Sequence, residues 1–325
     1  MATSLAVVVG CLLVLLVLVD VFRTVLWSGQ GAGPLTGAVT ALGRRLLSRL
    51  AGGARLRSAV GPIAIVAIVG LWAGLLLVGF SLVLEGQSGS FRTAFTDEPV
   101  GWSERAYFVG YSLFTLGNGD LRPVTDAGRL LTVAIAATGL FLISLSVTYL
   151  LPVTSAAVAS RSFASSARAL GETPEDVVLG AWDGERIRLD DELRQLAQSL
   201  SLLAEQQLAY PVLHLFESTD RRTSAPLAVA HLDEVLTLLD GVDRRVAPPA
   251  APRRQLRAAI RSYAQTYGAG VRADEVTPPP PDTGRLAVGG IPLIDPAAYT
   301  LAAADLDAHR AEVQGLVRAT GIARG

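Results

Sequence analysis

The chain has 325 residues, of which 50% are hydrophobic and 18% are charged, and its formal net charge is −1. This balance gives no basic excess that would suggest a nucleic-acid partner, whereas the apolar content is typical of a membrane protein with a soluble part. A single cysteine, Cys11, excludes a disulfide framework and a paired-thiol metal site. The three histidines are scattered and no nucleophile, base and acid pattern occurs, so neither an enzyme nor a cofactor is expected.

Three stretches are apolar and long enough to cross a hydrocarbon core of about 30 Å, which needs roughly 20 helical residues. They are Leu5 to Trp27, Gly61 to Leu84 and Leu130 to Leu151. The first stretch lacks a basic start, so we expect a retained helix and not a cleaved signal peptide. Arginines at positions 44, 45, 49, 55 and 57 predict that the next segment is cytoplasmic and that the N-terminus is outside.

Two features near the first span each leave two interpretations open. Asp20 and Arg23 share a helix face, so they either form an intramembrane pair that docks this helix or reach the membrane interface separately. Residues 35–50 repeat apolar side chains at gaps of three and four, which predicts an amphipathic helix. That helix either lies against lipid phosphates on the inner membrane surface or packs against its neighbours.

Between the second and third spans, a short apolar helix is expected from Glu104 to Thr115. It leads into Thr115-Leu116-Gly117-Asn118-Gly119-Asp120. Glycines one residue apart permit backbone conformations that most residues avoid, so successive carbonyl oxygens can point to one side and replace the water around a cation. Non-helical backbone at membrane depth is tolerated only where protein covers it or where it lines a water-filled path. We therefore predict a re-entrant pore helix followed by a filter segment, Thr115–Asp120.

The filter segment, with Leu121-Arg122-Pro123, Gly128-Arg129-Leu130 and Gly139, resembles the tetrameric potassium-channel superfamily, and the similarity extends from about Pro62 to Pro152. The resemblance implies a homotetramer with potassium as the permeant ion. The ion would bind the backbone carbonyls of Thr115, Leu116, Gly117 and Asn118, with Gly119 and Asp120 completing the filter.

Asn118 departs from the family pattern, and the charge of Arg122 complicates the expected conduction of cations. The family usually has an aromatic ring in place of Asn118, and that ring braces the filter. Asparagine keeps the carbonyl but removes this ring, so a non-selective sodium and potassium channel is one alternative. A membrane-anchored signalling or interaction protein with a degenerate pore module is another. Arg122, after the filter, would oppose cations unless Asp120 neutralises it.

The third span carries a stripe of apolar residues at helical spacing, which the resemblance assigns to the pore lining: Leu140, Ile143, Val147 and Leu151. A buried helix in any other protein would show the same stripe. The resemblance also implies a hinge at Gly139. Pro152 is expected to kink or end this helix near the cytoplasmic face.

Residues 156–325 have a soluble, helical character, with no strong strand pattern and no phosphate-binding motif. A heptad spacing fits either a tetramerising bundle or an amphipathic helix inside a globular domain; it comprises Leu189, Leu193, Leu196, Leu200 and Leu203. Further helices are expected at Pro226 to Leu239, Arg253 to Tyr267, and Pro296 to Arg318, with a Pro-rich linker at 276–296. The sequence contains no motif that identifies a cytoplasmic ligand or protein partner.

The expected fold class is all-α. An N-terminal transmembrane helix (1–28) precedes a cytoplasmic amphipathic linker (29–57), a pore module (58–155) and a cytoplasmic helical domain (156–325). With three transmembrane helices, the chain is expected to be a multi-pass protein of the plasma membrane. Its expected contacts are copies of itself and membrane lipid.

Overall fold

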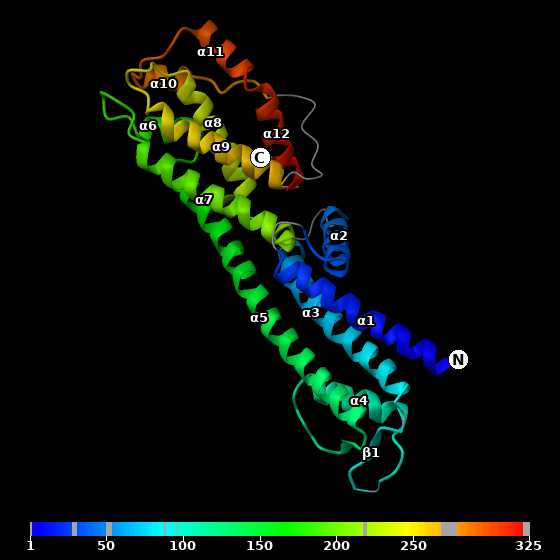
Figure 1. The fold of residues 1–325 in the computed structure, drawn as a ribbon. Coiled ribbons are helices and arrows are strands. Elements are labelled where there is room, and N and C mark those ends of the chain that lie inside the picture. Colours follow the sequence, from blue (N-terminus) through cyan, green and yellow to red (C-terminus); the bar gives the residue numbers. More distant parts are fainter. Residues whose placement is uncertain are drawn as a thin grey trace. The chain divides into compact units, whose positions relative to one another are not determined.

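A computed structural model describes residues 2–27, 31–49, 54–87, 89–95, 97–216, 220–267 and 278–320. Leu50 of the amphipathic segment and residues 276–277 of the Pro-rich linker lie outside these ranges. The chain divides into two compact units (Figure 1). The first comprises Met1–Gly43 and Pro62–Val153, and the second comprises Arg44–Gly61 and Thr154–Gly325.

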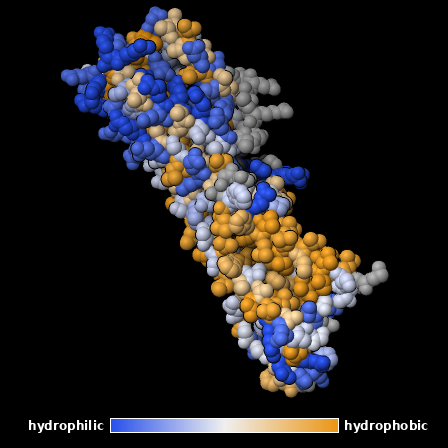
Figure 2. Space-filling view, in the orientation of Figure 1, coloured by the Kyte–Doolittle hydropathy of each residue, from blue (hydrophilic) through white to orange (hydrophobic). Residues whose placement is uncertain are grey.

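Three helices are long and apolar enough to cross a membrane: α1 (Ala2–Val25), α3 (Ala54–Glu85) and α5 (Asp126–Ala169). They coincide with the three predicted spans, except that α1 ends at Val25, two residues before the predicted end at Trp27, and the predicted all-α membrane fold is confirmed. Figure 2 shows hydrophobic side chains gathered over α1 and α3, as expected for helices that face lipid. The prediction that Pro152 ends a helix is wrong, because α5 continues to Ala169. Neighbouring groups can satisfy the backbone that a proline leaves unbonded inside a membrane helix.

In the first unit, α1 packs closely against α3 where two glycines meet. A Cβ atom added to Gly10 would lie only 2.5 Å from the carbonyl oxygen of Gly79. Small residues at such a crossing let two helix backbones approach, which favours association inside a membrane. The absence of side chains at this crossing therefore lets α1 pack directly against the backbone of α3.

Helix α2 (Pro34–Arg49) is joined to α1 and α3 by Asp20, whose side chain is fully buried. The carboxylate accepts hydrogen bonds from the backbone amide of Leu35 at 2.6 Å and from Trp72 Nε1 at 2.8 Å, and two more from Thr36. Arg23 is exposed. Asp20 therefore docks α1 by capping α2 and binding α3, and no pairing with Arg23 is involved.

The amphipathic helix α2 buries a different face from the one that its leucine pattern suggests. Thr36, Thr40 and Leu47 are buried, whereas Leu42 and Leu46 are exposed. The apolar stripe is therefore left largely uncovered by this chain. This arrangement keeps open the interpretation that the stripe contacts lipid.

Helix α4 (Trp102–Leu113) is the short helix expected before the filter segment, and it lies beside α5 in Figure 1. Its start is tied to the end of α3 by an ion pair between Arg105 and Glu85 at 2.7 Å. Two short strands, β1 (Phe91–Thr93) and β2 (Leu121–Pro123), form an antiparallel pair that the sequence did not predict. With three residues each, they are too short to show an alternating pattern.

The second unit is helical and is built around α8 (Ala225–Asp240), almost all of whose residues are buried. A helix that is apolar on all sides is expected to be enclosed by others. The elements that pack against α8 are α6 (Pro174–Gly180), η2 (Arg221–Thr223), α9 (Ala250–Tyr267), α11 (Pro296–Ala304) and α12 (Asp307–Ala319). The unit also contains the end of α5, α7 (Asp190–Ala209), η1 (Pro211–Leu215) and α10 (Gly284–Val288). Figure 2 shows hydrophilic residues over much of this unit's surface.

Two predictions for this region are resolved by the packing. The leucine seam of α7, including Leu193 and Leu200, is buried in the core of its own chain, and α7 packs against α9. The globular interpretation therefore holds, and the bundle interpretation is wrong. The helix predicted from Pro296 to Arg318 is two helices, which meet at Asp305 and Leu306 without a glycine or proline to mark the break. Asp295 caps α11 by accepting hydrogen bonds from two backbone amides.

Candidate ion-conduction site

Helix α4 carries the chain directly to the filter segment. Its apolar residues Phe108, Val109 and Leu113 are buried, and the helix ends at Leu113, two residues before Thr115. Backbone hydrogen bonds continue past the helix end, from Leu116 N to Tyr111 O at 2.8 Å and from Thr115 N to Ser112 O at 3.2 Å. The partial negative charge at the helix C-terminus therefore lies next to the first filter residue.

The backbone of the filter segment alternates in handedness. Thr115 has φ 57°, Gly117 has φ 63° and Gly119 has φ 77°, whereas Leu116 and Asn118 have no positive φ. In a regular strand successive peptide groups point to opposite sides, whereas alternating handedness lets them face the same way. A non-glycine residue with positive φ, such as Thr115, is strained and often marks a functional position. The segment thus has the backbone that a row of converging carbonyl oxygens requires.

The far end of the filter segment is held by the unpredicted two-stranded sheet. β2 begins at Leu121, directly after Asp120, and pairs with β1 in the register Thr93 to Leu121. The backbone amide of Ala94 donates to the carbonyl oxygen of Asp120 at 2.8 Å. The filter segment is therefore anchored by α4 at its start and by the sheet at its end.

The side chain of Asn118 is hydrogen-bonded to α4. Its amide nitrogen donates to the hydroxyl of Tyr107, and that hydroxyl donates to a carboxylate oxygen of Asp120 at 3.1 Å. The aromatic ring that braces the filter in the resembled family is absent at position 118. A polar link through Tyr107 joins this position to the pore helix instead. Tyr107 was not among the predicted site residues, because its contacts lie 11 and 13 residues away in sequence.

Asp120 does not neutralise Arg122. The guanidinium of Arg122 instead pairs with Asp97 at 2.8 Å, and both side chains are more than half exposed. A surface pair of this kind contributes about 0–1 kcal/mol to stability. Its main effect here is to offset the positive charge of Arg122 close to the end of the filter segment.

Comparison with known proteins agrees with this geometry. A family model described as ion channel matches residues 65–155, a range that contains α4 and the filter segment. The chain is also 34% identical over 317 residues to the "Uncharacterized membrane protein YdjJ" of Bacillus subtilis (strain 168), an alignment that covers 96% of this chain and 93% of that protein. The chain belongs to the ion channel family. No solved structure matches it.

The family assignment decides several of the predictions made from the sequence. The channel is a multi-pass membrane protein, the resemblance to pore-loop channels is confirmed, and the family is not enzymatic. The family also suggests an oligomer. Among the residues that the structure describes, no group of three or more His, Cys, Asp or Glu side chains could hold a metal ion.

The predicted pore-lining residues of the channel are exposed in the single chain. Leu140, Ile143, Val147 and Leu151 are each between 43% and 64% exposed. Gly139 faces the other way, against α4, where an added Cβ atom would lie 1.7 Å from the carbonyl oxygen of Leu113. Close helix packing therefore accounts for this glycine, and its function as a hinge stays a prediction, as does that of Pro152.

Proposed function

We propose that the channel is a homotetramer that conducts potassium passively through a ring of backbone carbonyl oxygens. The oxygens belong to Thr115, Leu116, Gly117 and Asn118, with the Thr115 hydroxyl at the inner end. The observation that carries this proposal is the alternating sign of φ from Thr115 to Gly119. Carbonyl oxygens that face one path can replace the hydration shell of a cation.

The subunit number follows from the geometry of ion binding. Each chain supplies one filter segment, and a closed ring of carbonyls around potassium needs four. The exposed apolar side chains of Leu116, Leu140 and Leu151 are consistent with assembly, because neighbouring copies would cover them or they would line a shared path.

Potassium is the proposed ion, and a mixed sodium and potassium channel is the second candidate. Asn118 favours the second candidate because it lacks the bracing ring. The link from Asn118 through Tyr107 to Asp120 favours the first, because it restrains the same filter positions from α4. Asn118→Tyr should raise potassium preference only if the polar link braces the filter less well than a ring would.

We also propose that the channel lies in the plasma membrane with its N-terminus outside and residues 156–325 in the cytoplasm. The arginines at positions 44, 45, 49, 55 and 57 support this orientation, because short cytoplasmic segments carry an excess of arginine and lysine. Cysteine-accessibility labelling of single cysteines at positions 31 and 180, in a Cys11→Ser background, tests it. Labelling of position 180 from outside intact cells would contradict the proposal.

Flux through purified channel in liposomes tests the proposed conduction. Potassium uptake under a potassium gradient should be present in the wild type and lost in Gly117→Ala, whereas Gly70→Ala in α3 should conduct normally. Sodium in place of potassium then distinguishes the two candidates. Normal uptake by Gly117→Ala would contradict a carbonyl filter at these positions.

A further inference from the structure

A cavity of about 540 Å³ lies in the second unit, where the last turn of α5 faces η2. Most of its lining residues carry polar or charged groups: Ser165, Arg168 and Ala169 come from α5, Glu172 from the turn that follows, and Arg221 and Arg222 from η2. Three guanidinium groups thus oppose one carboxylate. Sequence patterns do not reveal this cluster, because Arg168 lies more than 50 residues before Arg221 and Arg222.

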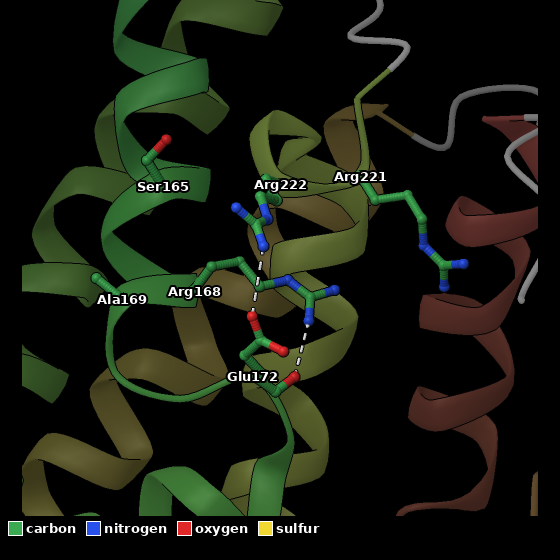
Figure 3. Close-up of a pocket in the computed structure, with 6 residues that line it drawn as sticks. All are labelled: Ser165, Arg168, Ala169, Glu172, Arg221 and Arg222. Carbon is green, nitrogen blue, oxygen red and sulfur yellow. Dashed lines mark hydrogen bonds and ion pairs between the residues drawn. The ribbon is translucent and has the colours of Figure 1, made fainter.

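The side chains converge on Glu172, as Figure 3 shows. Arg222 Nη2 lies 3.5 Å from a carboxylate oxygen of Glu172, and Arg168 Nη1 donates to the backbone carbonyl of Glu172 at 3.1 Å. Arg221 points away from Glu172 (Figure 3), and the structure gives it no ion pair among the described residues. A second carboxylate, Glu234, acts on Arg168 from an adjoining cavity, so three guanidinium groups face two carboxylates and the cluster keeps a net positive charge.

A second cavity, of about 310 Å³, shares Arg168, Glu172 and Arg221 with the first and continues to His231 on α8. His231 is buried, and its Nε2 has no hydrogen-bond partner among the described residues; the same holds for Arg168 Nε. Burial, followed by the charge of Arg168, lowers the pKa of His231 to about 4. His231 is thus neutral at physiological pH. The positive charge where the two cavities adjoin therefore comes from the arginines.

We propose that these arginines form a binding site for a phosphate-bearing anion, which takes the place of the Glu172 carboxylate. Guanidinium groups present planar pairs of donors that match phosphate oxygens, and such charge-assisted hydrogen bonds are among the strongest in proteins. The pair between Arg222 and Glu172 is exposed, and surface ion pairs are weak, so a doubly charged phosphate can displace the carboxylate. The bound anion joins the last turn of α5 to η2.

The size of the cavity and its surroundings narrow the ligand class. A volume of about 540 Å³ is in the range of small-molecule sites and exceeds what a chloride ion needs. The phosphate group can belong to a soluble anion or to a lipid headgroup. This inference concerns binding alone and does not depend on whether the channel conducts potassium.

Titration calorimetry of the purified full-length channel with inorganic pyrophosphate tests the proposal, with sodium chloride of equal ionic strength as the blank. We expect one saturable site per chain. Arg222→Gln and Arg168→Gln should each weaken binding roughly tenfold, the effect of one lost charge-assisted hydrogen bond. Glu172→Gln should strengthen binding about threefold, because the competing carboxylate is gone. Loss of fold would weaken binding in every variant, so the opposite sign for Glu172→Gln separates the two causes.

Arg254→Gln is the matched control. Arg254 lines another arginine-rich cavity, of about 570 Å³, so it changes the total charge equally without touching the proposed site. Short-chain phosphatidic acid in the same titration would assign the phosphate to a lipid if it binds more tightly than pyrophosphate and needs Arg222. The proposal is overturned if neither ligand binds, if Arg254→Gln weakens binding as much as Arg222→Gln, or if Glu172→Gln weakens it.

Discussion

The amide of Asn118 and the carboxylate of Asp120 are both hydrogen-bonded to one hydroxyl group, that of Tyr107 on α4. One atom of the pore helix therefore restrains two positions of the filter segment. In the resembled family an aromatic ring braces the filter, whereas here polar hydrogen bonds through Tyr107 join the filter segment to α4. This relationship makes Tyr107 the side chain through which α4 can influence ion preference.

Tyr107→Phe should lower the preference for potassium over sodium about fivefold, because it removes a hydrogen-bond partner worth about 1 kcal/mol from each filter position. Reversal potentials in mixed gradients measure this ratio. Tyr111→Phe is the control, since its hydroxyl donates to Leu121 O at 3.3 Å and has no hydrogen bond to Asn118 or Asp120. An unchanged ratio in Tyr107→Phe would exclude a bracing function for Tyr107.

Gly117→Ala should abolish conduction while leaving the chain folded. Position 117 has φ 63°, and a residue with a Cβ atom pays roughly 1–2 kcal/mol for a left-handed backbone. Gly70→Ala is matched to it, because in the single chain an added Cβ meets no atom within 4 Å at either position. The two variants thus differ in backbone conformation, and single-channel recording should show current only in Gly70→Ala. Equal currents would contradict the argument.

Gly139→Ala should destabilise the channel by about 1–3 kcal/mol through overpacking, since the new methyl group would meet the carbonyl oxygen of Leu113 at 1.7 Å. In an unobstructed helix the same change stabilises by up to about 1 kcal/mol. Gly74→Ala, at an open position of α3, should therefore shift the unfolding midpoint in the opposite direction. Denaturant unfolding in detergent measures both. A more stable Gly139→Ala would favour the hinge interpretation over packing.

Asp20→Asn should destabilise the first unit by about 1–3 kcal/mol. Asparagine offers one acceptor oxygen where the carboxylate receives bonds from α2 and from Trp72 Nε1 through both of its oxygens. Unfolding of Asp20→Asn, Trp72→Phe and the double variant should show a coupling above about 0.5 kcal/mol. Arg23→Gln should change nothing. If it destabilised as much as Asp20→Asn, a functional pair between Asp20 and Arg23 would have to be reconsidered.

The second unit should lose stability as the pH falls from 6.5 to 4. The pKa of His231 is about 4 in the folded chain and 6.5 in the unfolded chain, so only the unfolded chain gains this proton in that interval. The loss reaches about 3 kcal/mol below pH 4 and is absent above pH 7. Hydrogen exchange of the α8 amides measures it.

His231→Gln is the variant that isolates this effect, and it should flatten the dependence on pH. Burial also lowers the pKa of His214 to about 4, so part of the slope will remain in His231→Gln. A slope that is identical in the two proteins, or that rises toward acid, would refute the assignment to His231.

Local patterns in the sequence were sufficient to predict the elements that depend on local chemistry. Continuous apolar runs indicate the three spans, and the glycines at 117 and 119 indicate an unusual backbone, because few other residues tolerate positive φ. The helix caps are also local, because Thr173 and Asp295 accept hydrogen bonds from backbone amides two or three residues further along the chain. Each of these features is decided by residues that are continuous in sequence.

The features that the sequence did not predict depend on distant residues. Arg23 is the nearest opposite charge to Asp20, but the donors that Asp20 binds lie 15 to 52 residues away. The leucines of α7 define an apolar face without showing that α9 covers it. Likewise, only the fold brings Arg222 to the carboxylate of Glu172, 50 residues away in sequence.

The exposure of Leu140, Ile143, Val147 and Leu151 in one chain has a genetic consequence. If neighbouring copies complete every conducting path, conduction is a property of the whole assembly. One defective copy is then enough to abolish it. A Gly117→Ala chain produced together with the normal one should therefore be dominant. It should suppress current by far more than its share of the total protein.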